Sequence, residues 1–356
     1  MTRGTGGSLE TRGLAVRFTT RSGEEARALD GADLRVGSGE VVALVGESGS
    51  GKTTLARTLM GLEPPSSGQV FFGGKPLDYS GAGLKAFRRR VQMVLQDPAG
   101  ALNPRHTVYE SVAEGVRLHG LAGQDGRGTE VELVAAALAS AGLRPPETLF
   151  LRYPHELSGG QRQRVLIAGA LALEPELLIA DEPVSSLDAS IRGEILALLL
   201  KLRRELGLGV LVVTHDLGLA WNIADRIAVM YLGRIVEAGP TEEVLMDPRH
   251  PYTQALLSVV PEIERLTPVV LHGEIPDPTK VPSGCRFHPR CPAVADGSAA
   301  ADGVEDACRT VPLDVLPADP FGHHVACHLA ALRQPGAGST PRVSRGGPTT
   351  ERGRDL

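Results

Sequence analysis

Long hydrophobic runs are missing from this chain of 356 residues. No apolar stretch approaches the ~18 residues of a membrane-spanning helix, and the densest patch is only Ile195 to Leu200. The opening residues, Met1 to Gly4, do not resemble the start of a signal peptide. We therefore expect a soluble protein that stays in the cytosol and reaches a membrane only through a protein partner.

Positive charge and aromatic side chains are also scarce. The chain has 37 Lys and Arg against 42 Asp and Glu, a net charge of −5, so a nucleic-acid partner has no electrostatic support. Aromatic residues make up 4%, which we interpret as compositional bias. With 42% hydrophobic residues, the chain is long enough for one large domain and a smaller one.

Cysteine is rare, and all four cysteines fall in the last quarter of the chain: Cys285, Cys291, Cys308 and Cys327. Structural disulfides are uncommon in the cytosol, so a metal site enters the argument. Four thiolates match the ligand count of a [4Fe–4S] cluster, a proline follows Cys291 as in ferredoxin-type runs, and the Cys-x₂-Cys pairs typical of structural zinc are missing. Two alternatives stay open: free buried thiols, or a mixed zinc site with His288, His324 and His328.

What the chain does have is a glycine-rich run after the apolar segment Val41 to Val45: Gly46, Glu47, Ser48, Gly49, Ser50, Gly51, Lys52, Thr53 and Thr54. Its spacing and setting predict a phosphate-binding loop. Glycines let successive backbone N–H groups cradle a polyphosphate, Lys52 adds a mobile positive charge, and Thr53 can offer its hydroxyl to Mg²⁺. An ordinary glycine-rich turn is the alternative. We disfavour it because strand, loop and helix (about 52 to 59) come in the required order.

A second acidic element, Asp181-Glu182, ends the apolar run 177–180. In a parallel α/β sheet this end of a strand is where ligands lie. Asp181 suits Mg²⁺, whereas Glu182 can polarise a water for attack on the γ-phosphate. A solvated turn is the alternative for an isolated Asp-Glu-Pro, and the upstream Lys52 weighs against it.

A third element, Leu157 to Gln161, opens a strongly helical run. Ser158 is predicted to cap that helix, with free N–H groups of Gly159, Gly160 and Gln161 facing outward as a second phosphate-binding element. A plain helix cap is the alternative. Because about a hundred residues and a helical region separate this element from the loop, it should serve a nucleotide held by another chain.

The rest of the chain suggests four parts. Residues 1–8 are expected to be flexible, 9–240 to form the nucleotide-binding core, 241–333 to form an appended segment, and 334–356 to be a disordered tail. The core should open with an antiparallel β lip, strands 9–18 and 29–36, and contain a helical subdomain at about 97–175. Further strands are expected at 91–95, 177–180 and 210–213, with a helix at 189–206.

Together these motifs resemble the ATPase subunit of an ATP-binding-cassette transporter. The resemblance implies an α/β fold: a P-loop NTPase cassette with a RecA-like core, the antiparallel lip, the helical subdomain and a small C-terminal Cys-containing segment. It also implies a head-to-tail pair of cassettes. Each ATP would then lie between one chain's phosphate loop and the Ser158 and Gly160 of the partner cassette, which is a homologous or identical subunit.

The resemblance also gives roles to residues that are weak signals alone. His215 in Thr214-His215-Asp216 would contact the γ-phosphate, Gln96 would touch Mg²⁺ or the attacking water and sense the membrane subunit, and Asp188 would bridge the half-sites. Phe18 matches the position of the aromatic that stacks on adenine. The alternatives are a core histidine, a surface amide, a helix cap and a core phenylalanine, respectively.

Other segments resemble the dipeptide and oligopeptide importer ATPases: Gln96 to Pro98 with Leu102 to Arg105, Glu182 to Asp188, and His250 to Leu257. Val184-Ser185 favours the second ATPase subunit of such systems. The family implies two transmembrane permease subunits, an extracytoplasmic peptide-binding protein acting indirectly, and a peripheral position on the cytoplasmic face of the membrane. Nickel importers and a cassette ATPase of phosphonate breakdown share much of the pattern and stay as alternatives.

The tail agrees with this resemblance through Gly273 to Pro276, Gly284 to Pro292 and His324 to His328. Some family members carry an iron–sulfur cluster there. This chain has a longer gap after Cys291, and residues 293–307 are expected to loop out. Because the segment is Pro-rich with few apolar residues, its fold is expected to depend on the metal.

Overall fold

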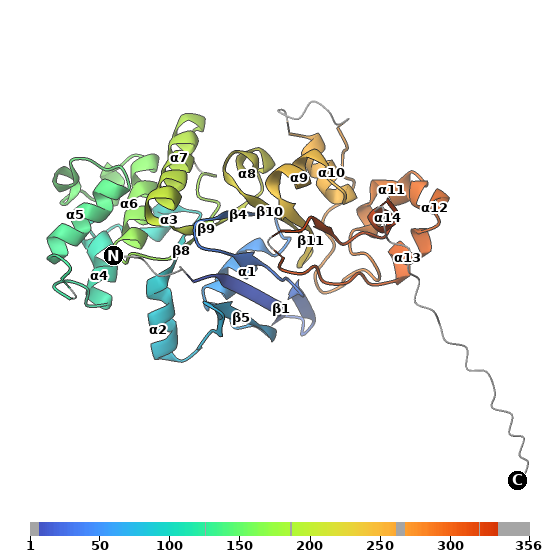
Figure 1. The fold of residues 1–356 in the computed structure, drawn as a ribbon, viewed down its shortest axis with the longest axis horizontal. Coiled ribbons are helices and arrows are strands. Elements are labelled where there is room, and N and C mark those ends of the chain that lie inside the picture. The colour runs from blue at the N-terminus through green and yellow to red at the C-terminus, as the bar shows by residue number, and fades with distance from the viewer. Residues whose placement is uncertain (1–6, 125, 186, 261–267, 320, 334–356) are drawn as a thin grey trace, which may run out of the picture.

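The computed structural model describes residues 7–124, 126–185, 187–260, 268–319 and 321–333. Two β-sheets occupy the middle of the molecule, the helices α4, α5 and α6 lie at one end, and the short helices α11 to α14 lie at the other (Figure 1). The predicted disorder of 334–356 lies outside the described residues, as do six of the eight residues expected to be flexible at the N-terminus.

The described strands form two sheets, one of five strands and one of seven. The first contains β1 (Leu9–Thr19), β2 (Glu25–Asp30), β3 (Arg35–Val36), β5 (Ser67–Phe72) and β6 (Lys75–Pro76). The second contains β4 (Val41–Val45), β7 (Val91–Val94), β8 (Leu177–Asp181), β9 (Gly209–Thr214), β10 (Arg226–Tyr231), β11 (Arg234–Pro240) and β12 (His324–Val325).

The described helices fall into three groups along the chain. Those of the core are α1 (Lys52–Leu59), α2 (Gly81–Arg90), α7 (Ala189–Leu206), α8 (Leu217–Ile223), α9 (Thr241–Met246) and α10 (Pro251–Ser258). The helical region has α3 (Pro98–Ala101), α4 (Val108–Leu118), α5 (Glu130–Ser140), α6 (Gly159–Leu171) and the 3₁₀ turns Pro146–Leu149 and Pro154–Glu156. The C-terminal segment has the 3₁₀ turn His288–Arg290, α11 (Pro292–Ala295), α12 (Ser298–Ala301), α13 (Glu305–Thr310) and α14 (His328–Arg333).

The five-stranded sheet is the predicted antiparallel lip, with a different division of its strands. A single strand was expected at 29–36, whereas the structure has β2 ending at Asp30 and a separate β3 at Arg35–Val36. Both pair antiparallel with β1. The break falls at Gly31, whose φ of 86° lies in the left-handed region that turns the chain out of the strand.

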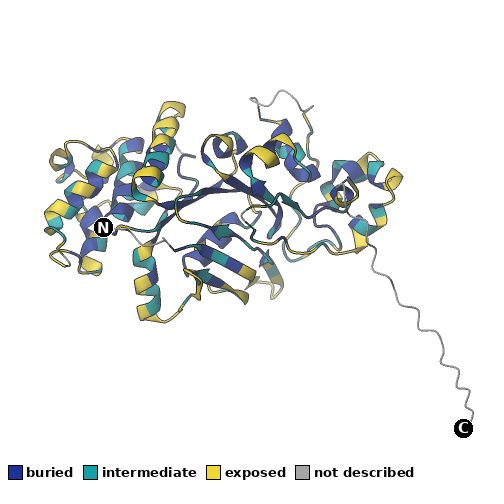
Figure 2. Cartoon of the chain, in the orientation of Figure 1, coloured by how far each residue is buried: buried dark blue, intermediate teal, exposed yellow. Residues whose placement is uncertain are grey.

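The seven-stranded sheet has the order β12-β11-β10-β4-β9-β8-β7. Its five members from β10 to β7 pair parallel, and β4, β8, β9 and β10 are buried at every position. These strands therefore read as continuous apolar runs rather than alternating ones, as expected for a sheet covered on both faces. Figure 2 shows the same strands as a dark band, with α7, α8 and α9, whose outer faces are exposed, above it and α1 with the five-stranded sheet below it.

The helical region begins its two long helices with reciprocal caps. Thr107 with Glu110, and Thr129 with Glu132, form capping boxes that satisfy backbone N–H groups at the starts of α4 and α5. Their apolar faces pack against α6 and α7 in one buried cluster that includes Val112, Leu138 and Ile167. The predicted helical subdomain is thus present between β7 and β8.

The C-terminal segment is built into the core. Its strand β12 pairs antiparallel with β11, and Phe287, which is 1% exposed, packs its ring against Tyr231 and Tyr252 at centroid distances of 5.1 and 5.3 Å. All four cysteines share this buried cluster. The segment therefore buries more apolar surface than its sequence indicated. The expected loop at 293–307 is also wrong, because it forms α11, α12 and the first part of α13, with Ala293 and Ala299 buried.

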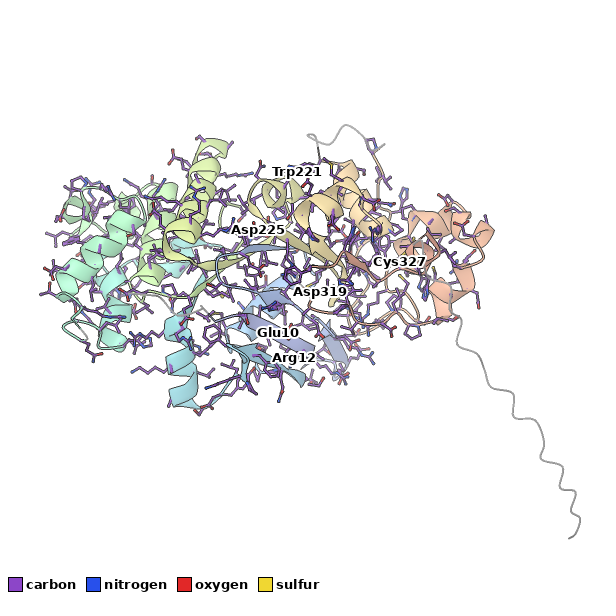
Figure 3. The ribbon with its side chains drawn as sticks, in the orientation of Figure 1. Glu10, Arg12, Trp221, Asp225, Asp319 and Cys327 are labelled. Atoms are coloured by element: carbon purple, nitrogen blue, oxygen red, sulfur yellow. The ribbon has the colours of Figure 1, made fainter. Side chains whose placement is uncertain are left out.

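Polar contacts also fix the parts to one another. Asp225 accepts hydrogen bonds from the Val41 N–H at 2.7 Å and from Arg203 Nη2 at 2.9 Å, joining β4 and α7 to the start of β10. Asp225 and the exposed Trp221 of α8 are labelled in Figure 3, with Cys327 on the C-terminal segment.

Candidate nucleotide site

The glycine-rich loop joins β4 to α1, as the sequence predicts. Gly51 precedes the helix with a φ of 107°, and a Cβ there would lie 2.6 Å from the Ala28 carbonyl oxygen. A Cβ on Gly46 would lie 2.3 Å from the Met230 carbonyl oxygen. Real Cβ atoms do not approach other atoms this closely. Strands β2 and β10 therefore leave room only for glycine at positions 46 and 51, and the loop backbone turns tightly against them.

Lys52 begins α1 with its side chain folded back onto the loop. Its ammonium donates to the carbonyl oxygens of Gly46 at 2.7 Å and Glu47 at 2.9 Å, and the residue is 6% exposed. Burial lowers the pKa of Lys52, while the carboxylates of Glu182 and Asp181 oppose that shift. The positive charge is therefore held inside the loop, where a phosphate would meet it.

Asp181 is the last residue of β8 and is 4% exposed. Burial raises the pKa of its carboxyl group, and the neighbouring Thr53 hydroxyl partly opposes this rise. Its Oδ1 is buried with no hydrogen-bond partner in the described part of the chain. A buried carboxylate oxygen without a partner, beside a threonine hydroxyl, is a donor pair that fits Mg²⁺.

Glu182, Gln96 and His215 come together in one hydrogen-bonded group. Glu182 Oε2 accepts from Gln96 Nε2 at 2.9 Å, and its Oε1 lies 3.1 Å from His215 Nδ1. Glu182 adopts a φ of 46°, uncommon for a residue with a side chain, while its N–H donates to the Val213 carbonyl at 2.8 Å. The three residues follow β7, β8 and β9, so the parallel sheet brings them to one edge.

Two adjoining cavities lie at this edge. One, of about 270 Å³, is lined by Gly51, Lys52, Thr53, Thr54 and Glu182 together with Arg27. The other, of about 940 Å³, is lined by Gln96, Glu182 and His215 together with Glu47, Arg290 and the segment Gly273 to Pro278. Ser48 and Gly49 line both. The loop and the three polar residues thus face one continuous recess.

Ser158 caps α6 in a capping box with Gln161, as its sequence predicts. Ser158 and Gly159 are exposed and Gly160 is buried. Residues Ser158 to Gln161 are not among those that line the two cavities. In the described chain, this capped helix end is therefore not part of the recess that the loop faces.

Two predicted residues stand outside the recess. Asp188 occupies the N-cap position of α7, is exposed, and forms no side-chain cap bond. Phe18 lies near the end of β1, is 38% exposed, and is not among the residues that line the cavities. The bridging role of Asp188 and the adenine-stacking role of Phe18 stay predictions.

The four cysteines are buried, and none forms a disulfide. Burial raises the pKa of Cys285 to about 12 and that of Cys308 to about 11, reinforced in each case by the neighbouring thiols. Yet the described residues contain no group of three or more His, Cys, Asp and Glu side chains placed to hold a metal ion. This arrangement does not support the predicted iron–sulfur cluster.

The mixed zinc alternative fits no better. His288 Nδ1 lies 2.9 Å from the Cys285 carbonyl oxygen, His324 Nε2 lies 3.0 Å from Asp319, and His328 Nε2 lies 2.9 Å from the Val311 carbonyl oxygen. These bonds use one nitrogen of each ring and are compatible with a metal on the other, but no group of three or more His, Cys, Asp and Glu side chains in the described residues is placed to hold an ion.

Sequence reasoning missed the contribution of residues beyond 240 to this recess. Pro278 lines the smaller cavity, and its carbonyl accepts a hydrogen bond from the Arg27 N–H at 3.0 Å. Arg290 and Tyr252 contact the phosphate loop itself. The acidic residue at position 47 was a weak indication of this contribution, because a carboxylate in a phosphate-binding loop is favoured by a cation nearby.

Two known protein families match parts of this chain. The family described as ABC transporter matches residues 29–185, and the family described as oligopeptide/dipeptide transporter, C-terminal region, matches residues 236–297. The oligopeptide transport ATP-binding protein OppF of Salmonella typhimurium is 42% identical over 333 residues, which cover 88% of this chain and 97% of that protein. The chain belongs to the ABC transporter family.

Two further relatives support this ABC transporter assignment. The oligopeptide transport ATP-binding protein AppF of Bacillus subtilis is 41% identical, covering 90% of this chain and 97% of that protein. The cassette MJ0796, solved as a dimer in a post-hydrolysis state with ADP and Pi, superposes with a TM-score of 0.58 at 30% identity, covering 65% of this chain and 98% of that one. The α/β cassette fold is confirmed, and the chain is an ATP-binding, ATP-hydrolysing subunit of its family. Within the described residues, no helix has the length and apolarity to cross a membrane.

The contacts of Glu182 lead to a prediction. Glu182→Gln should keep ATP binding while hydrolysis falls about 10²–10⁴-fold, because an amide cannot accept the proton of an attacking water. Turnover with Mg²⁺ and ATP, together with the size of the protein on a column, measures both effects. We expect a closed dimer to accumulate, and near-normal turnover would remove Glu182 from the chemistry.

Proposed function

We propose that this chain is the ATP-hydrolysing subunit of an ABC importer that takes up dipeptides or oligopeptides. The observation that carries the ATPase part is Glu182, held between Gln96 and His215 at the edge of the phosphate-loop recess. The peptide part is supported by the match of residues 236–297 to the oligopeptide/dipeptide transporter region and by relatives named for oligopeptide transport.

The residues of the recess divide the chemistry. The loop N–H groups and Lys52 hold the phosphates, and Thr53 with Asp181 would hold Mg²⁺, with Gln96 as a further contact. Bound Mg²⁺ neutralises charge on the phosphate oxygens. In this division, Glu182 accepts the proton of the attacking water, and His215, 61% exposed at its side chain, would contact the γ-phosphate.

The capped end of α6 completes the site of a second cassette subunit, homologous or identical to this one. Ser158 and the backbone N–H groups of the two glycines that follow it suit a phosphate, whereas the Gln161 N–H is bonded to the Ser158 hydroxyl, and none of these residues lines this chain's own recess. Two cassettes packed head to tail would each supply this end to the other's nucleotide, with Asp188 between the half-sites. ATP then favours the closed pair because its contacts to the second cassette exist only when the pair is closed.

In this proposal the cassette comprises residues 9–240, with its helical subdomain at about 97–175, and the extension comprises 241–333. The cassette pair lies peripherally on the cytoplasmic face of two transmembrane permease subunits. An extracytoplasmic protein delivers the peptide to those subunits. Closing and reopening of the cassettes is the movement that the permeases would use.

The head-to-tail arrangement separates two variants. Ser158→Arg should abolish hydrolysis and leave the ATP affinity of the monomer nearly unchanged, because Lys52 and its loop are intact. Lys52→Ala should lose ATP binding itself, because the buried positive charge is gone. Titration of a fluorescent ATP analogue into each variant measures this, and equal loss of affinity in both would argue against the sandwich.

Uptake tests the proposed substrate class. Cells carrying the Glu182→Gln chain in place of the natural one should stop accumulating labelled tri- to pentapeptides, while the variant still co-purifies with the membrane subunits. Labelled nickel and growth on a phosphonate serve as controls. Normal peptide uptake with loss of either control activity would reassign the chain to a nickel importer or a phosphonate-breakdown complex.

The iron–sulfur prediction has a direct test. Protein purified without oxygen would be brown and contain about four irons per chain if the four thiolates held a cubane cluster. Buried thiols without a metal would give colourless protein with no stoichiometric iron or zinc. Metal analysis decides between them, with Cys285→Ser as the matched variant for any iron found.

A further inference from the structure

Glu47, the second residue of the phosphate loop, has all of its polar groups engaged. Its N–H donates to the Tyr252 hydroxyl at 2.9 Å, and its carbonyl oxygen accepts from Lys52 Nζ at 2.9 Å. Its carboxylate forms a two-bonded pair with Arg290, from Nη1 to Oε2 at 2.8 Å and from Nη2 to Oε1 at 3.1 Å. Two of these three partners come from beyond residue 240.

Arg290 is held firmly where it meets the loop. Its side chain is 6% exposed, its guanidinium lies 5.9 Å from the centre of the Tyr231 ring, and its Nε donates to the His272 carbonyl at 3.4 Å. Directly after His272 comes Gly273 to Pro278, the segment that lines the larger cavity. Arg290 therefore connects the phosphate loop with the segment that follows His272, and both line the recess.

The charge of Glu47 explains why such a partner is needed. Glu47 and Arg290 both line the larger cavity, beside Ser48 and Gly49 of the loop. A carboxylate at this position without a cation would repel the phosphates that the loop is built to bind, and a bidentate arginine cancels that charge while fixing its direction. The Glu47–Arg290 ion pair also fixes the position of the Glu47 carbonyl group, which accepts a hydrogen bond from Lys52 Nζ.

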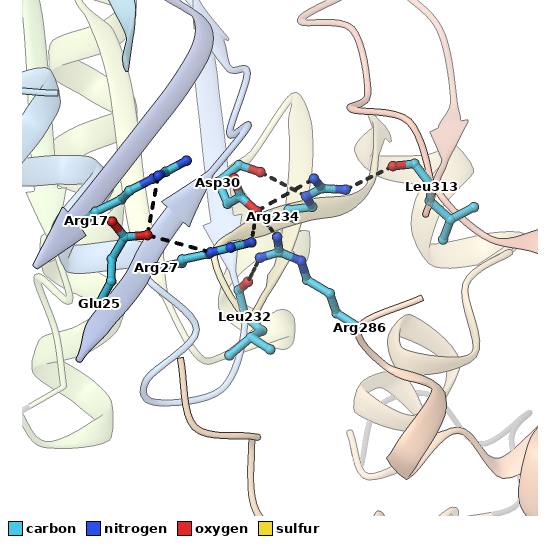
Figure 4. Close-up of polar contacts among 8 residues, drawn as sticks. All are labelled: Arg17, Glu25, Arg27, Asp30, Leu232, Arg234, Arg286 and Leu313. Atoms are coloured by element: carbon cyan, nitrogen blue, oxygen red, sulfur yellow. Dashed lines mark hydrogen bonds and ion pairs between the residues drawn. The ribbon is translucent and has the colours of Figure 1, made fainter. Parts of the chain in front are cut away.

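A second arginine of the same run anchors the other side of the recess. Arg286 is 8% exposed, donates from Nη1 to the Leu232 carbonyl at 2.6 Å, and pairs with Asp30 at the end of β2 (Figure 4). Leu232 lines the smaller cavity. The run Cys285 to Cys291 thus contacts the nucleotide site from two directions.

We propose that Arg290 is a positioning residue for ATP binding, acting through Glu47. It neutralises the carboxylate of the phosphate loop and fixes the loop carbonyl that holds Lys52. This inference rests on the proposed ATPase function, but it concerns the extension, which thereby becomes part of the nucleotide site. Arg290 is assigned no contact with the reacting atoms.

Four variants test this: Arg290→Ala, Arg290→Lys, Glu47→Gln and the double variant Arg290→Ala/Glu47→Gln. Arg290→Ala should raise the KM for ATP about tenfold or more with a smaller change in kcat, because it leaves a half-buried negative charge unpaired beside the phosphates. Arg290→Lys should be intermediate, because an ammonium keeps the charge and loses the fork. The double variant should recover to within about threefold of Glu47→Gln alone, because the amide carries no charge to neutralise.

Arg309→Ala is the matched control, because Arg309 also lies on the extension and, within the described residues, its side chain is 51% exposed and pairs with Glu305 one turn away. It should leave KM and kcat unchanged. A fluorescent ATP analogue should reproduce the KM series as dissociation constants, so the inference is read from binding even if wild-type hydrolysis fails. Failed hydrolysis with the series intact would sink the proposed function alone.

Recovery in the double variant is the outcome that a merely structural role would not give. An unchanged KM in Arg290→Ala, or a double variant as impaired as Arg290→Ala, would overturn the inference. Thermal unfolding of each variant identifies misfolding. If Arg290→Ala does not fold, the decision rests on Arg290→Lys, whose KM should rise at least about threefold and whose equality with wild type would overturn the inference.

Discussion

Parallel pairing of β4, β9, β8 and β7 is the constraint on which the nucleotide site depends. Parallel strands end at the same edge of a sheet, so the phosphate loop, His215, Glu182 and Gln96 emerge side by side although more than 160 residues separate the first from the last along the chain. The register of the sheet places Val45 beside Thr214 and Asp181 beside Val213. The hydrogen bonds that the Glu182 carboxylate forms with Gln96 and His215 follow from where the strands end.

Burial sets the electrostatics of this edge. Lys52 and Asp181 are almost fully buried. Burial favours the neutral form of each group, so it lowers the pKa of Lys52 and raises the pKa of Asp181. Their mutual attraction opposes both shifts, so the lysine and the carboxylate support each other's charge. Such a site is poised for a ligand that brings a polyphosphate and a divalent cation together, because each ligand charge then meets its opposite.

The extension contacts the phosphate loop of the cassette. Phe287 packs into a cluster with Tyr231 and Tyr252, and the same cluster places Arg290 against Glu47. Apolar packing of the cysteine-containing run and the geometry of the phosphate loop are therefore coupled through one ion pair. Loosening the extension should therefore disturb the phosphate loop through this ion pair.

The sequence by itself determined the local chemistry of this protein. Glycines at the loop, apolar runs before it and before Asp181, and the helix at 189–206 follow from steric freedom, burial and periodicity within a few residues, so these elements are confirmed where they were predicted. The capping box at Ser158 is equally local. Short-range rules suffice there because each signal lies within one turn or one strand.

Tertiary structure alone decided what the C-terminal segment does. Its short helices, its strand beside β11 and the pairing of Arg290 with a residue 243 positions away depend on contacts between distant segments, for which a single sequence has no period to read. The arrangement of the four thiols was decided in the same way, since ligand count is a property of the sequence and convergence is a property of the fold. The sequence sets which side chains are present, and tertiary packing sets which of them come into contact.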